Sequence, residues 1–129
     1  MVDLMMSIHH DFAQAIYNGK KNYEFRKNHV TQDVRWVYMY ETAPYKQVTG
    51  RFSVKNVLTA DPNVLYLLCG KYEESHLTRE QFKQYYAGSK TGTALEIDRV
   101  EKFDQPKTLA NFGIKRAPQN YTTIKVDID

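Results

Sequence analysis

Gly19-Lys20-Lys21-Asn22-Tyr23-Glu24-Phe25-Arg26-Lys27 is the most informative stretch of the sequence. Its side chains alternate from Lys21 onward, with Tyr23 and Phe25 on one side and Glu24 and Arg26 on the other. This alternation predicts a β-strand with one charged face. Gly19 just before it is the usual end of a helix, and residues 11–18 have the apolar spacing of one.

Similar runs on both sides of this strand predict the rest of the fold. Further strands are expected at residues 4–8, 34–41, 48–58, 92–103 and 121–128. Asp61-Pro62 predicts the start of an apolar packing helix that Gly70 closes, and Thr78 with Gln81 forms a capping box before a helix ending at Gly88. About six strands with two or three flanking helices indicate an α+β barrel or strongly curved sheet, in a single domain spanning residues 1–129.

Composition narrows the class of protein. The chain has 129 residues, a net charge of +3 and one cysteine, so it forms no internal disulfide and fits a reducing compartment. No apolar run approaches the roughly 20 residues of a membrane span, and the first residues do not resemble a secretion signal. We therefore expect a cytoplasmic protein with no membrane partner, in which Cys69 is a buried apolar side chain.

Sequence motifs exclude several common site types. The four histidines show no HxxxH spacing, and one cysteine cannot supply CxxC, so no metal site is expected. The chain also lacks the GxSxG, Walker and GxGxxG signatures, and we expect no cofactor.

The charged face of residues 21–27 is the best candidate for a site. Such a face is most often solvated, and an exposed ion pair is worth about 0 to 1 kcal/mol. If Glu24 and Arg26 line a cleft instead, the carboxylate accepts from a base N–H and the guanidinium binds a carbonyl or phosphate oxygen. Lys21 would add a second cation, although the sequence leaves open whether Lys20 or Lys21 faces inward. The ten tyrosines, Trp36 and six phenylalanines include candidates for stacking on bases.

The chain resembles the ASCH domains, a branch of the PUA-like superfamily. The match is carried by Met6-Ser7-Ile8-His9, by Gly19-Lys20-Lys21 and above all by Tyr23-Glu24-Phe25-Arg26-Lys27, which is similar to the family's GxKxxExR signature. Weaker similarity extends to Ala117-Pro118-Gln119-Asn120-Tyr121. The resemblance implies a PUA-like β-barrel with a cleft that contains Lys21, Glu24 and Arg26, and a role in binding RNA or a modified nucleoside. Residues expected to complete the pocket are Tyr40, Gln119 and Tyr121.

Two alternatives stay open. Some small members of the family are similar to amidohydrolases that deacetylate modified cytidine with a lysine and a threonine three residues later. Here Glu24 occupies the threonine position, so Lys21 and Glu24 would be the catalytic residues if the chain is such an enzyme. A protein-interaction domain is the second alternative, and an exposed apolar patch would mark it.

Overall fold

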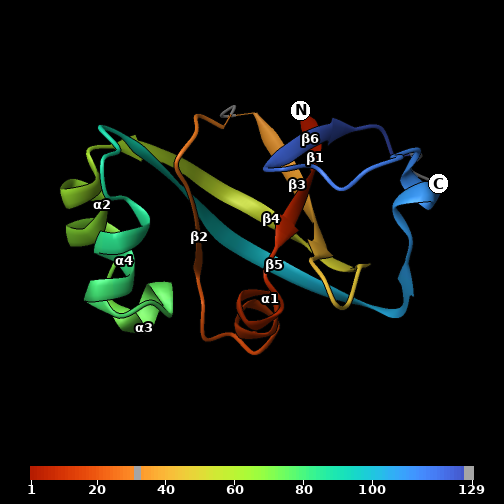
Figure 1. The fold of residues 1–129 in the computed structure, drawn as a ribbon, viewed down its shortest axis with the longest axis horizontal. Coiled ribbons are helices and arrows are strands. Elements are labelled where there is room, and N and C mark those ends of the chain that lie inside the picture. The colour runs from red at the N-terminus through yellow and green to blue at the C-terminus, as the bar shows by residue number, and fades with distance from the viewer. Residues whose placement is uncertain (31–32, 127–129) are drawn as a thin grey trace.

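The computed structural model describes residues 1–30 and 33–126, which form one curved mixed sheet with helices around it (Figure 1). The strands are β1 (Val2–Ile8), β2 (Tyr23–Arg26), β3 (Val34–Glu41), β4 (Gln47–Ala60), β5 (Gly92–Lys107) and β6 (Tyr121–Ile124). Their order in the sheet is β2-β5-β4-β3-β1-β6, with β1 and β3 parallel and the other pairs antiparallel. The predicted α+β class with six strands is confirmed, while residues 127 and 128 of the last predicted strand lie outside the described residues.

The helices are α1 (His10–Tyr17), α2 (Pro62–Cys69), α3 (Tyr72–Ser75) and α4 (Arg79–Tyr85), followed by the 3-10 helix η1 (Leu109–Phe112). The capping box is present, because Thr78 Oγ1 accepts from the Gln81 N–H and Gln81 Oε1 accepts from the Thr78 N–H. The described residues form four α-helices where two or three were expected. The extra one is α3, whose four residues are too few to show a helical period.

α2 packs against the core as predicted, but through one side only. Leu65 and Cys69 are its buried residues, and both belong to an apolar cluster with α4, β2 and β5. Leu67 and Leu68 are 74% and 64% exposed. A helix that rests on one surface buries a single stripe, so an apolar composition all round leaves the other side in solvent.

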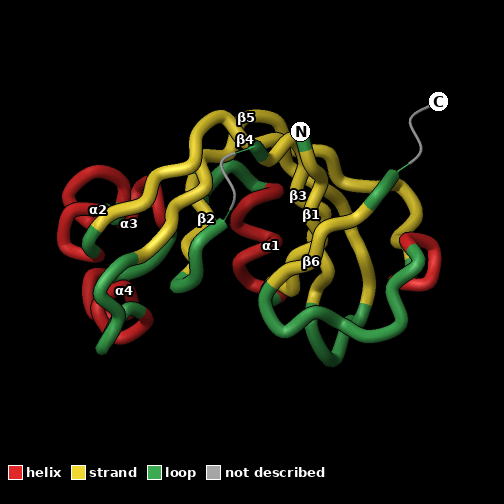
Figure 2. The backbone as a smooth tube through the Cα atoms, turned by 90° about the horizontal axis from the view of Figure 1, so that it is seen from above, coloured by secondary structure: helices red, strands yellow, loops and turns green. Residues whose placement is uncertain are grey.

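Three apolar clusters hold the sheet and helices together. One lies between α1 and the sheet, a second joins α2 and α4 to β2 and β5, and a third lies under η1. α2, α3 and α4 gather at one end of the molecule and α1 lies near its middle (Figures 1 and 2). The backbone passes close to its neighbours at Gly50, since a Cβ there would meet Glu101 O and the Tyr17 ring. No helix in the described ranges is long and apolar enough to cross a membrane.

The sheet curls so that its two edge strands, β2 and β6, are joined by side chains. Arg26 of β2 donates to Ser7 O of β1 at 3.0 Å and to Asn120 Oδ1, just before β6, at 2.8 Å. The Tyr121 hydroxyl of β6 donates to His29 O at 2.9 Å. We call this line of contacts the seam.

Candidate functional site at the seam

Lys21 enters the interior of the protein between α1 and β2. The backbone N–H groups of Lys20 and Lys21 both donate to Ala15 O, and this turn leaves Lys20 exposed and Lys21 only 2% exposed. Lys21 Nζ donates to Ser75 O at 2.8 Å and lies 3.9 Å from Glu24 Oε1. The structure therefore answers the question that the sequence left open: the inward lysine is Lys21.

Burial lowers the pKa of Lys21 below its usual value. Desolvation is the largest cause, the carboxylate of Glu24 opposes it, and the charge of Arg26 adds to it. The ammonium lies 4.9 Å from the ring centroid of Phe12 and 5.1 Å from that of Phe25, so little water reaches it. A larger fraction of Lys21 is consequently neutral near pH 7 than of an exposed lysine, which gives it some capacity as a base.

Glu24 and Arg26 form the second part of the cluster. Arg26 Nη2 donates to Glu24 Oε2 at 2.9 Å, and Glu24 is 6% exposed. The same guanidinium makes the seam contacts to Ser7 and Asn120. Its Nε is buried without a hydrogen-bond partner in the described residues. We call Lys21, Glu24 and Arg26 the triad; it brings two cations and one carboxylate together in a mostly dry environment.

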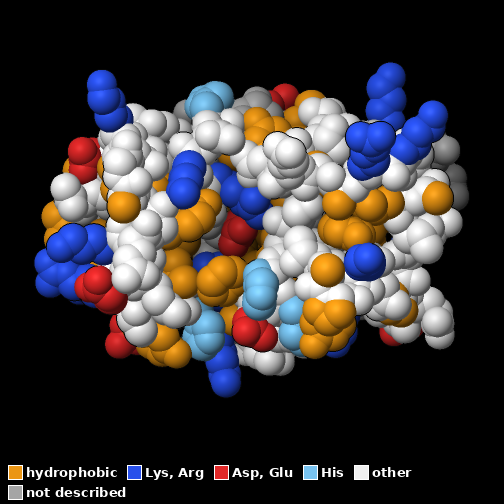
Figure 3. Space-filling view, viewed as in Figure 1, with side chains coloured by type: hydrophobic (Ala, Val, Ile, Leu, Met, Phe, Trp, Pro, Cys, Tyr) orange, Lys and Arg blue, Asp and Glu red, His pale blue; other side chains and the backbone are white. Residues whose placement is uncertain are grey.

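The triad lines a pocket of about 490 Å³, which we call the seam cleft. A hollow with acidic and basic side chains inside it is visible near the centre of Figure 3. Apolar walls come from Ile8, Phe12, Phe25 and Leu77. The polar lining outside the triad comes from Ser7, His9, Gln81, Gln84 and Tyr85. An apolar concavity with a few convergent polar groups is the usual form of a small-molecule site.

The other three predicted site residues lie elsewhere. Tyr40 packs on the opposite side of the sheet with Trp36 and Tyr38, and it lines a different hollow. Gln119 is exposed and Tyr121 is partly buried, and neither lines the seam cleft. The residue between them, Asn120, is the one that contacts Arg26. The predicted segment is therefore at the seam, but its contact to Arg26 comes from Asn120, which lies in a bend just before β6.

Sequence reasoning did not identify one wall of the cleft. Gln81, Gln84 and Tyr85 have the spacing i, i+3 and i+4, which places them on one face of α4. The Tyr85 hydroxyl donates to Phe25 O at 3.1 Å, which ties α4 to β2. Burial raises the pKa of Tyr85, so it stays a neutral hydrogen-bond donor near pH 7. The helical period was the available signal, but only the fold shows which face of α4 meets the triad.

His10 and Cys69 have local partners outside the triad. His10 Nδ1 contacts Glu41 Oε1, and its ring stacks on Tyr45 with centroids 3.8 Å apart. In the described part of the chain, no three His, Cys, Asp or Glu side chains are grouped as metal ligands. Cys69 is 1% exposed, and burial raises the pKa of its thiol to about 11, as suits a buried apolar side chain.

A curved mixed sheet of six strands with helices around it and a cluster of charges at its seam defines an α+β protein of the PUA-like kind. The sequence model of the ASCH domain matches residues 6–107, and the chain belongs to that family. The crystal structure of ASCH from Zymomonas mobilis is similar, with a TM-score of 0.82 and 26% identity over 95% of this chain and 87% of that one.

Sequence relatives extend this result. An ASCH domain-containing ribonuclease of Zymomonas mobilis is 29% identical over 95% of this chain and 84% of that protein. ATP synthase subunit alpha of Ureaplasma parvum is also 29% identical over 95% of this chain, but the chain spans only 15% of its length. The chain likewise spans 39% of the ribosomal protein uL22 from the same species.

Proposed function

We propose that the seam cleft binds a base of single-stranded RNA or a modified nucleoside. The observation that carries this proposal is the convergence of Lys21, Glu24 and Arg26 on one pocket with aromatic walls. In this role Glu24 accepts from a ring or exocyclic N–H, while Lys21 and Arg26 donate to carbonyl or phosphate oxygens. Phe12 and Tyr85 supply ring surfaces against which a base can pack.

The comparisons support RNA as the ligand class. The Zymomonas mobilis relative is named a ribonuclease, and the chain covers 84% of it. A net charge of +3 favours approach to a polyanion. Gln119 and Tyr121 stay predicted contacts for a ligand longer than one nucleoside, because they flank Asn120 at the seam. We assign no contact to Tyr40. The single buried thiol is in keeping with the cytoplasm, where we place the protein.

Calorimetric titration tests the proposal, with short single-stranded RNAs and a panel of plain and acetylated nucleosides at two salt concentrations. We expect saturable binding that Arg26→Gln weakens at least about tenfold, since one charge-assisted contact is worth roughly 1.5 to 3 kcal/mol. Arg51→Gln is the matched control, because Arg51 is also a strand arginine paired with a glutamate, Glu101, but lies outside the cleft. Circular dichroism checks that each variant is folded.

NMR chemical shifts of the backbone amides test the proposal on the unaltered protein, without any substitution. Added RNA or nucleoside should move the signals of residues 21–26 and of Gln81, Gln84 and Tyr85 more than those around Arg51. Absence of saturable binding at low salt for every RNA and nucleoside would refute the proposal.

A hydrolase is the second candidate, and the lowered pKa of Lys21 favours it. Lys21 would act as the base and Glu24 would help to activate water, on an amide of an acetylated nucleoside or on RNA itself. Incubation with acetylated cytidine and with labelled RNA tests both substrates. Activity that persists unchanged in both Lys21→Met and Glu24→Gln would exclude this mechanism.

A further inference from the structure

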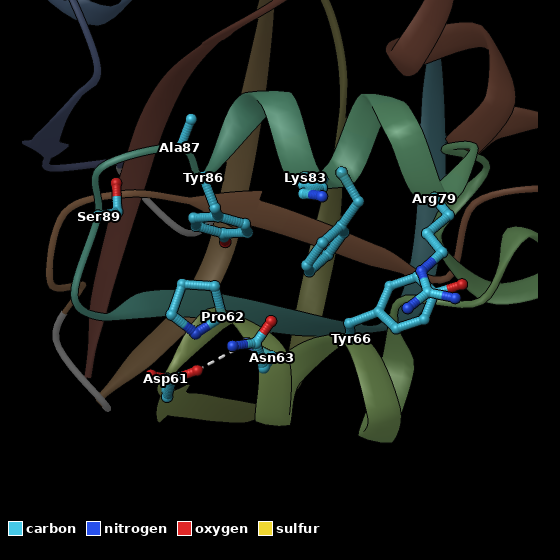
Figure 4. A pocket seen from close by; sticks show the side chains of 10 residues that line it. Asp61, Pro62, Asn63, Tyr66, Arg79, Lys83, Tyr86, Ala87 and Ser89 are labelled. Carbon is cyan, nitrogen blue, oxygen red and sulfur yellow. Dashed lines mark hydrogen bonds between the residues drawn. The ribbon is translucent and has the colours of Figure 1, made fainter.

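A second hollow lies on the other side of α4 from the seam cleft. It has a volume of about 350 Å³ and opens between α4 and the start of α2. Figure 4 shows aromatic rings and Arg79 gathered there between the two helices. The side chains that matter for its chemistry are Asn63, Tyr66, Arg79, Phe82, Lys83 and Tyr86. We call it the α4 hollow.

Aromatic rings form the floor of the α4 hollow. The rings of Tyr66 and Phe82 are 5.4 Å apart, and those of Phe82 and Tyr86 are 5.0 Å apart. The Arg79 guanidinium lies 5.5 Å from the Tyr66 ring centroid. Proteins that bind single strands combine ring surfaces for bases with cations for the phosphates, and this hollow has both.

The charge of the α4 hollow favours an anion. Arg79 and Lys83 are exposed cations in its lining. The one carboxylate in the lining is Asp61, which accepts from the Asn63 N–H at 2.8 Å as the cap of α2. Glu80, also exposed on α4, is not part of the lining. The lining of the α4 hollow therefore contains two cations and one carboxylate, and this carboxylate already has a hydrogen-bond partner.

α4 is a shared wall between the α4 hollow and the seam cleft. Tyr85 faces the seam cleft and has the Lys27 ammonium 5.1 Å from its ring, so a cation and a ring stand together on that side too. Tyr86 lines the α4 hollow, and its hydroxyl donates to Arg26 O at 3.0 Å, which fixes the two sites relative to each other. A helix with its side chains is about 10 to 12 Å across, a span that a strand of a few nucleotides crosses.

We infer that the α4 hollow is a subsite for a nucleotide that flanks the base held in the seam cleft, with the RNA strand crossing over α4. The inference rests on the proposed function of the seam cleft. In it, a flanking base packs on Tyr66, and Arg79 and Lys83 bind the adjoining phosphates. A free nucleoside reaches only the seam cleft, whereas an oligonucleotide reaches both sites.

The experiment compares a random-sequence RNA hexamer with the nucleoside panel on the full chain. The double variant Arg79→Ala/Lys83→Ala should bind the hexamer about tenfold more weakly, with nucleoside affinity unchanged. Its salt slope should fall by about 0.7 for each of the two lost phosphate contacts. Tyr66→Leu should weaken hexamer binding without a change in slope, because the ring carries no charge.

Lys115→Ala/Arg116→Ala is the matched control, because it removes the same charge from two exposed residues beyond η1. Equal losses of hexamer affinity in both double variants would reduce the effect to net charge and overturn the inference. An unchanged hexamer affinity, or an equal loss for nucleosides, would overturn it as well. In these cases nucleoside binding to the unaltered protein shows that the seam cleft is intact. If neither hexamer nor nucleoside binds the unaltered protein, both proposals fall.

Discussion

Two strand arginines, each paired with a glutamate, sit in opposite environments in this protein. Arg26 contacts Glu24 at 2.9 Å, with side-chain exposures of 11% and 7%. Arg51 contacts Glu101 at 2.7 Å, with exposures of 25% and 46%. The shortest nitrogen–oxygen distances of the two pairs are similar, although Arg51 also donates to the same Glu101 oxygen through its Nε. The difference is that the first pair is withdrawn from water and shares its site with a second cation, Lys21.

The difference in burial bears on how much each ion pair contributes to stability. The Arg51 guanidinium lies 3.7 Å from the Trp36 ring and donates to the Tyr38 hydroxyl, so it covers apolar surface while water still reaches its partner Glu101. Burial of charges costs several kcal/mol per ion, and well-packed apolar residues in their place are often as stable. The triad is therefore costly for stability alone, and this cost supports the proposal that it binds a ligand.

Glu24→Gln should have the largest effect on stability of the changes considered. It leaves Lys21 and Arg26 close together without a counter-charge, and removal of one partner from a buried pair costs about 3 to 5 kcal/mol. Urea denaturation at neutral pH measures the loss in the free energy of unfolding.

Glu101→Gln is its matched control. The same chemical change at the exposed pair should cost less than about 1 kcal/mol. If both variants lost the same amount, burial would not distinguish the two pairs, and the argument that the triad is costly would fail.

Tyr86→Phe should have an intermediate effect that depends on pH. The hydroxyl donates to Arg26 O at 3.0 Å, and its loss should cost about 1 to 2 kcal/mol at neutral pH. Burial raises the pKa of Tyr86 above its usual value near 10. The folded state then holds the phenol proton more tightly than the unfolded state does. This contribution to stability is full below pH 10 and is lost as the pH rises toward the raised pKa.

Urea denaturation at several pH values from 7 to 11 tests this prediction. The gap between the unaltered protein and Tyr86→Phe should narrow above pH 10, because phenylalanine has no proton to lose. Tyr38→Phe, which removes the hydroxyl beside Arg51, should cost less, since Arg51 keeps Glu101 and access to water. A gap for Tyr86→Phe that is constant with pH would contradict the raised pKa.

Local signals in the sequence account for what could be predicted of the fold. The strand predicted at residues 34–41 is confirmed as β3, in which the alternate residues Trp36, Tyr38 and Tyr40 belong to one apolar cluster. The caps at Asp61 and Thr78 are likewise confirmed, since a cap depends on residues two or three apart. Such features depend on residues that are close in sequence, so they can be predicted without the positions of distant residues.

The candidate site depended on contacts that no local pattern contains. Arg26 donates a hydrogen bond to Asn120, which lies 94 positions away in the sequence. The burial of Glu24 and Arg26 likewise depends on the curl of the sheet. The choice of Lys21 over Lys20 follows from the turn onto Ala15 O. Alternation therefore identified the charged face of residues 21–27, but it could not say whether water or protein lay against that face.

Arg51→Lys should have the smallest effect and gives the comparison a spectroscopic measure. Lysine keeps the charge opposite Glu101 but loses the flat guanidinium that lies on Trp36, so the free energy of unfolding should fall by about 1 kcal/mol or less. Trp36 is the only tryptophan of the chain, so its fluorescence reports on the surroundings of this one ring, which Arg51 and Arg99 share. We expect a shift in emission for Arg51→Lys and none for Arg26→Lys, because the Arg26 guanidinium makes its contacts at the seam and not at Trp36. An equal shift in both variants would show that the two clusters are coupled through the sheet, and the triad could then no longer be treated as a separate site.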